Sequence, residues 1–283
     1  MKNTQLIIVE GLMGTGKTST ASFIQKYVEQ QHIEASVFLE GDLDHPVDFE
    51  GVACLNEEEY TSLLHQFVHD QECIQQIVHI QGHNYFFFYQ KAKQMLADTF
   101  PDDLYTYIAT YDIYELPLAR HCEVLLQSWR DFAERLASTD EIIILECCFF
   151  QNPMCMLLAK SNADQSVITQ YILELADIIQ PLQPVLIYLY QEDIRKTLDK
   201  VSTERSSEWL DFVIWYYTEQ EYGKAHQLSG LDGLIESLKV RRTLELEILE
   251  QLNMNKLLID NSALHWEQIQ QKLIDYLNES KNS

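Results

Sequence analysis

Eight residues near the start of the chain, Gly11 to Thr18, carry its clearest chemical pattern. They read G-L-M-G-T-G-K-T and match G-x-x-x-x-G-K-[S/T] at every position. Glycines let such a loop curl so that several backbone N–H groups point inward, and the following helix presents its positive end to the same point. The pattern predicts a phosphate-binding loop, in which Lys17 reaches the β- and γ-phosphates and the Thr18 hydroxyl binds Mg²⁺.

The residues on both sides of this loop support the interpretation. Leu6 to Val9 is a short apolar run typical of a buried strand, and apolar residues recur at helical spacing from Ala21 to Val28. We therefore expect one strand–loop–helix unit to hold the phosphates of a nucleotide. The residues expected to bind it are Met13, Gly14, Thr15, Gly16, Lys17, Thr18 and Ser19.

Acidic residues follow a second short apolar run, Ala35 to Leu39. Glu40 and Asp42 would then lie at the carboxyl edge of a parallel sheet, where open α/β sheets bind their ligands. A hydroxyl that attacks a phosphoryl group benefits from a carboxylate within hydrogen-bond reach. Asp42 is the first candidate for this base and Glu40 the second, and the alternative is a solvated acidic loop.

A third carboxylate, Glu146, directly follows the mostly apolar run Glu141 to Leu145. This run is expected to form the strand beside the first one. A buried carboxylate is costly unless it is paired, so simple packing explains it poorly. Glu146 is predicted to lie near Mg²⁺ or a metal-bound water together with Thr18, and the alternative is a strand-terminal residue turned to water.

Basic side chains follow the apolar run Pro184 to Tyr190. Arg195, Lys200 and Arg205 could each close onto the β- and γ-phosphates, and Arg205 is the first choice because it lies well into the segment. A solvated helical face with local ion pairs would show the same spacing. The adjacent Arg241 and Arg242 are expected to pair with nearby glutamates, and the alternative is that they face a ligand.

Other residues allow two interpretations each. The aromatic run Tyr85 to Tyr89 is expected to pack among helices, although it could also stack on a planar ligand ring. Gln151 and Asn152 could read a ligand edge or cap a turn before Pro153. The six cysteines show no C-x-x-C spacing, which favours buried, reduced thiols, and the alternative is that Cys147, Cys148 and Cys155 are redox-active or bind a soft metal.

The elements that must position these residues alternate along the chain. Five apolar runs separated by helical patterns predict a parallel sheet with helices on both faces. The runs are Leu6 to Val9, Ala35 to Leu39, Glu141 to Leu145, Pro184 to Tyr190 and Lys256 to Ile259. No stretch is rich in Gly, Ser or Pro, so we expect one domain over 1–283, with a mostly helical insertion at about 56–139 and a helical lid-type segment at about 191–255.

Composition narrows the class of partner. Acidic residues outnumber basic ones 44 to 20, giving a net charge of −24, which disfavours broad association with nucleic acid. No apolar run approaches the roughly 20 residues that span a bilayer. The first residues, MKNTQ, lead directly into the first strand. A cytoplasmic protein that binds a small molecule, with no nucleic-acid or membrane partner, is therefore expected, and its oligomeric state, a dimer included, stays open.

Taken together, the chain resembles the P-loop kinases that include the thymidylate, deoxynucleoside and other nucleotide kinases. The residues that carry the resemblance are the segment V-E-G-L-M-G-T-G-K-T with Glu10 ahead of the glycines, the acidic end of the second strand and the basic segment after the fourth. The resemblance implies a three-layer α/β sandwich with a five-stranded parallel sheet and large helical insertions. It also implies that the basic segment is a lid, and that Glu10 contacts the acceptor or fixes the loop.

One departure from the family pattern bears on the substrate. Thymidylate and deoxynucleoside kinases usually carry an arginine soon after the third strand, whereas this chain reads L-E-C-C-F-F-Q-N from Leu145 to Asn152. The missing arginine counts against a nucleoside monophosphate as acceptor and leaves room for a neutral acceptor such as a nucleoside, a sugar or another alcohol.

The sequence thus predicts an ATP- and Mg²⁺-dependent phosphotransferase that acts on a small, nucleoside- or nucleotide-like acceptor. The competing hypotheses are a P-loop ATPase and a regulatory or partner-binding protein that holds a nucleotide without phosphorylating an acceptor. A guanine-nucleotide switch is disfavoured, because Asp48 to Gly51 matches D-x-x-G but does not follow a buried strand, and Asn255 to Leu258 lacks the aspartate of N-K-x-D.

Overall fold

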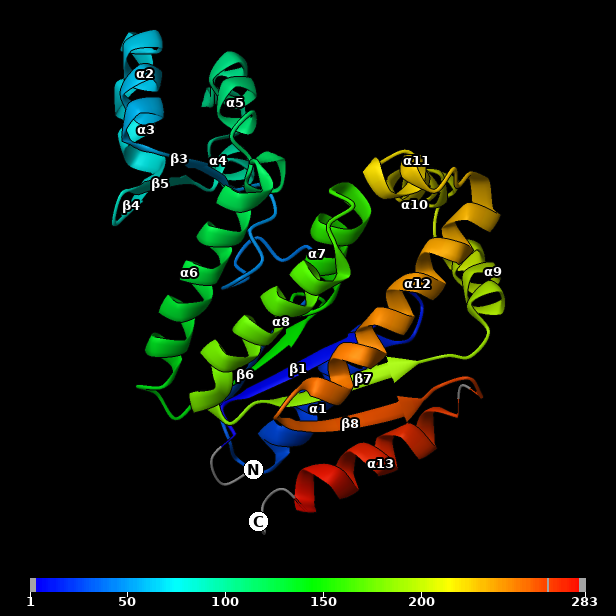
Figure 1. Ribbon diagram of the computed structural model, residues 1–283. Helices are drawn as coiled ribbons and strands as arrows, with labels where there is room; N and C mark the ends of the chain where they lie inside the picture. Colours follow the sequence, from blue (N-terminus) through cyan, green and yellow to red (C-terminus); the bar gives the residue numbers. More distant parts are fainter. Residues whose placement is uncertain (1–3, 264, 280–283) are drawn as a thin grey trace. The chain divides into compact units, whose positions relative to one another are not determined.

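Five parallel strands form the central sheet, in the order β2-β6-β1-β7-β8 (Figure 1). They are β1 (Leu6–Gly11), β2 (Ala35–Phe38), β6 (Ile142–Glu146), β7 (Val185–Tyr190) and β8 (Asn255–Asp260). This computed structural model describes residues 4–263 and 265–279. It divides into two compact units, residues 41–125 and a larger unit made of the residues up to 40 and from 126 onward. The sheet belongs to the larger unit and confirms the predicted α/β fold.

β1 is the middle strand, and all six of its residues are buried. It pairs with β6 and β7 on its two sides, so that Val9 lies opposite Glu146 on one neighbour and Ile187 on the other. A strand covered on both faces needs apolar residues at every position rather than alternate ones. That requirement explains why the continuous apolar runs located all five strands.

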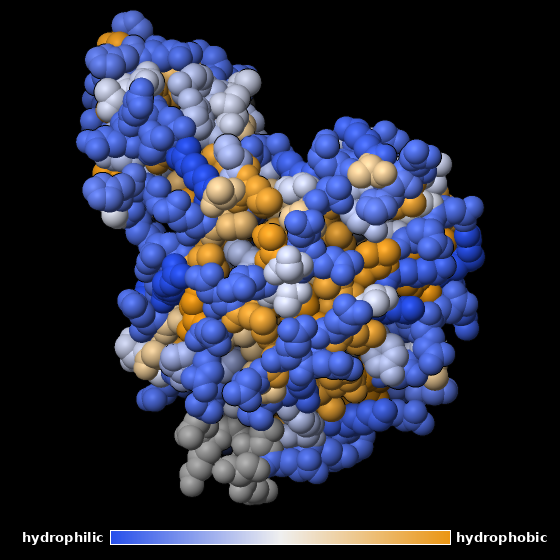
Figure 2. All heavy atoms as spheres, viewed as in Figure 1, coloured by the Kyte–Doolittle hydropathy of each residue, from blue (hydrophilic) through white to orange (hydrophobic). Residues whose placement is uncertain are grey.

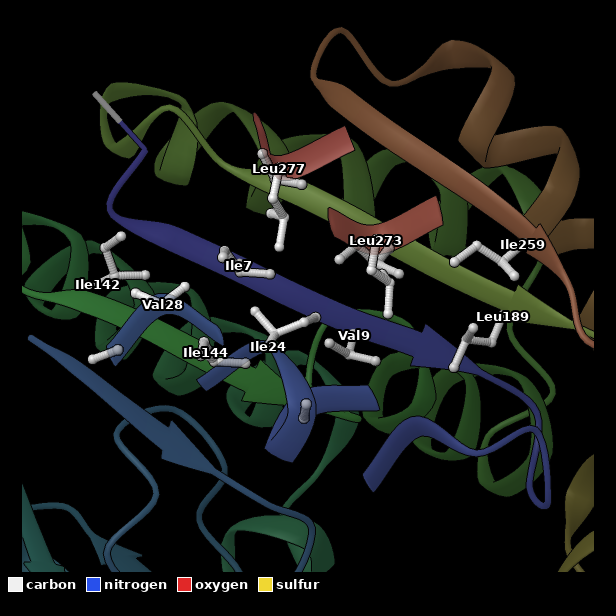
Figure 3. Close-up of a cluster of buried hydrophobic side chains, with 14 of the residues drawn as sticks. Ile7, Val9, Ile24, Val28, Ile142, Ile144, Leu189, Ile259, Leu273 and Leu277 are labelled. Atoms are coloured by element: carbon white, nitrogen blue, oxygen red, sulfur yellow. The ribbon is translucent and has the colours of Figure 1, made fainter. Parts of the chain in front are cut away.

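Helices cover one face of the sheet through a single apolar cluster. α1 (Lys17–Gln30) and α13 (Trp266–Glu279) pack there, and Figure 3 shows Ile24 and Leu273 against the side chains of β1. Apolar residues at intervals of three and four place one stripe of each helix on the sheet. This cluster fixes the start of α1, and with it the loop between β1 and α1.

The opposite face is covered by α8 (Gln165–Ile179) and α12 (Gly230–Gln251), which completes a three-layer sandwich (Figure 1). The Tyr188 hydroxyl of β7 donates to Glu245 Oε2 of α12 over 2.6 Å. α7 (Gln151–Pro153) and a π-helix (Met154–Lys160) follow β6. Figure 2 shows hydrophilic residues over most of the visible surface, with apolar residues gathered over α8 and α12.

The segment after β7 is helical, as the sequence predicts. It contains α9 (Ile194–Glu204), α10 (Ser207–Thr218) and α11 (Glu221–Ala225). The Asp193 and Ser206 side chains accept hydrogen bonds from the first-turn N–H groups of α9 and α10. Such N-terminal caps satisfy N–H groups that have no partner inside the helix, and they fix where each helix begins.

The smaller unit contains an antiparallel sheet in the order β3-β5-β4. Its strands are β3 (Ala53–Leu55), β4 (Val78–Gln81) and β5 (Asn84–Phe87), and its helices are α2 (Glu57–Gln66), α3 (Gln71–Ile77), α4 (Tyr89–Leu96) and α5 (Asp102–Ala109). α6 (Leu118–Leu136) begins in this unit and ends in the larger one. Short 3₁₀-helices lie at Val68–Asp70, Ala97–Thr99, Ile113–Glu115 and Gln180–Leu182. Within the described ranges, no helix is both long and apolar enough to cross a bilayer.

The aromatic run packs against the helices of this unit, as expected, but most of it lies in a strand that was not expected. Tyr85, Phe86 and Phe87 lie in β5, where Tyr85 stacks on Tyr60 of α2 with ring centroids 4.2 Å apart. β4 and β5 form a hairpin whose two-residue turn begins at Gly82, at φ 59°. A continuous apolar run has no periodicity, so it cannot distinguish a strand from a buried helix.

Candidate active site

The loop between β1 and α1 has a backbone that depends on glycine at three positions. Gly11, Gly14 and Gly16 have φ values of 143°, 79° and 89°, which side chains of L-residues rarely adopt. A Cβ on Gly11 would lie 2.1 Å from the Leu189 carbonyl oxygen of β7. The loop can therefore pass the end of the neighbouring strand only without a side chain at this position.

Side chains from the loop and from β8 hold this shape. The Thr15 hydroxyl donates to the Leu12 carbonyl over 2.8 Å, and Lys17 Nζ donates to the same oxygen over 3.1 Å. Asn261, directly after β8, donates through Nδ2 to the Thr15 carbonyl over 2.6 Å. Asn261 is not among the site residues expected from the sequence, although its position directly after a predicted strand was a usable signal.

The two residues predicted to share a metal ion are in direct contact. Thr18 Oγ1 donates to Glu146 Oε1 over 2.7 Å, and the Glu146 side chain is 1% exposed. Thr18 lies in the first turn of α1 and Glu146 at the end of β6, so the packing of α1 on the sheet brings them together. Their oxygens are a hydroxyl and a carboxylate, the ligand types that Mg²⁺ takes from proteins.

Lys17 is buried and lies close to acidic groups. Burial alone would lower its pKa, but Glu40 and Glu146 are among the groups that raise it, and the pKa of Lys17 ends above its usual 10.5. The side chain therefore remains a cation at neutral pH. An ammonium group at this position meets the requirement for stabilising phosphate oxygens.

Glu40 lies beside Glu146, close to the loop after β6. Its backbone N–H donates to Glu146 Oε2 over 3.5 Å, and Gln151 Nε2 donates to Glu40 Oε1. The Cys147 thiol contacts Glu40 Oε2 at 3.6 Å, from a backbone with φ 68°. The second-choice base is therefore the carboxylate that the structure places with Lys17 and Glu146.

The first-choice base, Asp42, belongs to the smaller unit. Its Oδ1 accepts the N–H of Asp44 over 2.9 Å, which is a local turn contact. Its assignment as the base stays a prediction, which parallel substitutions of Asp42 and Glu40 would test.

Glu10 has a clear structural role at the end of β1. Its carboxylate accepts the backbone N–H groups of Phe149, Phe150 and Gln151 over 2.6, 2.9 and 3.3 Å, so the loop that it fixes is the one after β6 and not the glycine loop. Complete burial raises the pKa of Glu10 to about 7, with Glu245 adding to the rise against the lowering effect of these N–H groups. Glu10 thereby holds the loop that carries Gln151.

A cavity of about 610 Å³ opens beside the phosphate-binding loop, entirely within the larger unit. Lys17, Thr18, Glu40 and Glu146 line it. Residues of α9, of α10 and of the link between them also line it, among them Lys200, Arg205, Trp209 and Phe212. The cavity therefore joins the glycine loop to a space of the size that takes a small molecule.

The predicted lid cations differ in their surroundings. Arg205 follows α9 and lies over the Trp209 ring at 5.9 Å, on the cavity. Lys200 also lines it, with Glu204 at 3.8 Å. Arg195 instead pairs with Asp232 and lines a separate cavity. Arg205 and Lys200 thus remain candidates for contact with phosphates.

Arg241 pairs with a glutamate, as expected, whereas the Arg242 side chain donates to the backbone carbonyls of Gln191 and Glu192. Arg241 Nε donates to Glu245 Oε1 over 2.6 Å, one helical turn along α12, and the Arg241 side chain is 1% exposed. Arg241 also lines the cavity, together with Tyr217 of α10. Only the packing of α12 against α10 brings this arginine to the site.

Comparisons with known proteins give similarities of fold alone. No family model and no curated protein matches the chain. Thymidylate kinase from Candida albicans is 13% identical, with 99% of this chain and 93% of that chain covered at a TM-score of 0.45. A protein thought to be a kinase, from Chloroflexus aurantiacus, is 12% identical, with 100% and 98% covered at a TM-score of 0.34. At these identities and scores neither similarity decides what this chain does.

Proposed function

We propose that this chain is a P-loop phosphotransferase, which moves the γ-phosphate of ATP to a hydroxyl of a small, nucleoside- or nucleotide-like acceptor. The observation that supports it most is that Lys17, Thr18 and Glu146 line the same cavity as the aromatic side chains of α10. A phosphate-binding loop alone would suit any P-loop protein. A cavity of about 610 Å³ that continues from it favours an enzyme with a second substrate.

The donor side of the reaction would use the loop and its neighbours. Backbone N–H groups from Met13 to Ser19 and the Lys17 ammonium would hold the phosphates of ATP. The Thr18 hydroxyl and the Glu146 carboxylate fit Mg²⁺, which keeps several waters and takes few protein ligands. When bound, Mg²⁺ supplies charge that offsets the charge on the transferring phosphoryl group.

The acceptor side would use a carboxylate and a basic side chain. Glu40 is close enough to Lys17 to affect its pKa, and it can accept the proton of a hydroxyl that attacks the γ-phosphate. Asp42 is the other candidate for this base. Arg205, at the end of α9, would stabilise the negative charge that develops during transfer.

The test is ADP release by the purified chain with ATP and Mg²⁺, across a panel of nucleosides, nucleotides, sugars and other alcohols. We expect release that depends on the acceptor and that Lys17→Ala abolishes. Lys26→Ala is the matched control, because Lys26 is an exposed lysine on the same helix. ADP release that is equal with and without every acceptor would overturn the proposal and favour an ATPase. Binding of ATP with no turnover at all would favour a nucleotide-dependent regulatory protein.

A further inference from the structure

The cavity contains a buried arginine with an unsatisfied donor. Arg241 Nε donates to Glu245, and Nη1 donates to the Tyr217 hydroxyl over 2.8 Å. Nη2 is buried as well, yet it has no hydrogen-bond partner among the described residues. A buried charged donor without a partner is strongly unfavourable, because it has given up water and received nothing in return. An oxygen atom from another molecule in the cavity would remove this penalty.

Rings of α10 lie on the same cavity. Trp209, Phe212 and Tyr216 line it, and Phe212 is 58% exposed. The ring centroid of Phe212 lies 6.1 Å from that of Tyr216 and 5.8 Å from that of Trp215. An exposed aromatic surface next to a polar floor suits a planar ring that carries a polar group on one edge.

The charges around Arg241 indicate which polar group fits. Glu245 is fully buried and already neutralises the guanidinium across 2.6 Å. Its charge also reaches Glu10, whose pKa it helps to raise. An anion at Nη2 would therefore be repelled by Glu245, and by Glu10 when that group is ionised. A neutral carbonyl oxygen would complete the hydrogen bonding without that repulsion.

We propose that the acceptor has a planar ring with a neutral carbonyl oxygen, which accepts a hydrogen bond from Arg241 Nη2 while the ring packs on the aromatic side chains of α10. The proposal rests on the proposed function, since it describes the second substrate of the same site. It names a specificity-determining residue on α12, which lies far along the chain from the loop after β6.

Binding of matched nucleosides tests this directly, by calorimetry and without turnover. Inosine and adenosine differ at C6, where adenosine carries an amino group in place of the carbonyl oxygen and has no other ring carbonyl. Uridine and cytidine differ in the same way at C4, but cytidine keeps its C2 carbonyl, so this pair reports on the C4 position alone. We expect the wild-type chain to bind inosine at least about tenfold more tightly than adenosine, because the amino group cannot accept from Arg241. Equal binding of inosine and adenosine, or no binding of any of the four, would overturn the proposal.

Two variants assign the preference to the arginine. The double variant Arg241→Met with Glu245→Met removes both charges together, so that no uncompensated charge remains buried. We expect this double variant to bind the two members of a nucleoside pair about equally. Arg241→Lys keeps a cation opposite Glu245 and should lower the preference, which makes the test independent of whether the double variant folds. A preference that both folded variants retain would overturn the proposal.

Arg242→Met is the matched control. Arg242 is the next residue of α12, donates to the Gln191 and Glu192 carbonyls and does not line this cavity, so the preference should be unchanged. The corresponding nucleoside monophosphates form the last arm, in which the same carbonyl preference is expected, and binding of the monophosphates that does not depend on the ring carbonyl would overturn the assignment of Arg241 to the ring. Since binding is measured without ATP hydrolysis, a carbonyl preference without any ADP release would contradict the proposed function and leave the binding site standing.

Discussion

The Thr18 hydroxyl donates to Glu146 Oε1 over 2.7 Å and joins the first turn of α1 to the end of β6. These residues are 128 positions apart in the chain. In the proposed function this hydroxyl and carboxylate would supply the protein ligands of Mg²⁺, and the phosphates and water would supply the others. The proposed chemistry depends on this contact more than on any other.

Replacement of Glu146 tests the contact. Glu146→Gln keeps the shape of the side chain but removes the negative charge, so we expect ADP release to fall at least about 100-fold. Assays at several Mg²⁺ concentrations should show a raised magnesium requirement. Glu141→Gln is the matched control, since Glu141 precedes the same strand at its other end and accepts from Ser36. An unchanged rate in Glu146→Gln would remove this residue from the site.

The identity of the base is decided by two parallel variants. Glu40→Gln should lower kcat by about 100-fold or more, because Glu40 lines the cavity with Lys17 and an amide does not take the proton. Asp42→Asn is expected to have a smaller effect, since its carboxylate is engaged in a local turn. Both variants are measured at saturating ATP and acceptor. A larger loss in Asp42→Asn would restore the first choice made from the sequence.

Arg205→Ala should reduce kcat/KM for ATP at least about tenfold, because a charge-assisted contact with phosphate is lost. The free energy of unfolding should change by no more than about 0.5 kcal/mol, since the residue is exposed. Arg195→Ala provides the comparison, as Arg195 is engaged with Asp232 outside this cavity. Equal losses in the two variants would show that general surface charge, rather than Arg205, is responsible.

Glu10 should make the stability of the fold depend on pH. Its pKa rises from 4.5 to about 7 through burial, so the folded chain holds the proton more tightly than the unfolded chain. The stability contributed by the protonated form is complete below pH 4.5 and is lost as the pH rises toward 7. Between pH 5 and pH 8 the loss amounts to about 2 to 3 kcal/mol.

The variant Glu10→Gln isolates this contribution, because it stays neutral over the whole range. Denaturant unfolding at pH 5 and pH 8 should show a difference between the two pH values that is smaller in the variant than in the wild type. Glu29→Gln, an exposed carboxylate on α1, should behave as the wild type does. An identical pH dependence in Glu10→Gln and wild type would contradict the raised pKa.

The centre of the sheet was predictable because β1, β6 and β7 are buried on both faces. Residues such as Ile7 and Ile144 are fully buried, where a polar side chain would be unfavourable, so these strands are visible in the sequence as continuous apolar runs. The hairpin of β4 and β5 was missed for the opposite reason. His79 and Gln81 are exposed, and the aromatic residues of β5 form a run with no alternation, so only Gly82 marked the turn.

The candidate site also contains residues that the sequence predicts and residues that only the tertiary packing brings there. Lys17 and Thr18 follow from a motif whose spacing fixes their geometry, and Glu146 follows from its place at a strand end. Arg241 could be assigned a partner, Glu245, because the two are four residues apart on a helix. Its place in the cavity depends on how α12 packs against α10, and local sequence carries no information about that packing.

Because Met154–Lys160 is a π-helix, the number of residues in this segment affects which of its groups reach α10. Each residue of an ordinary helix advances about 100° around its axis, and the wider winding here accommodates more residues in each turn. Deleting Met154 would move Cys155 back by one position, which turns it by about 100° if the segment then winds as an ordinary helix. The Cys155 carbonyl, which now accepts from the Tyr216 hydroxyl over 3.1 Å, would then turn away from α10. A deletion after Cys155 should have a smaller effect on this contact, because it lets the turn relax toward an ordinary α-helix.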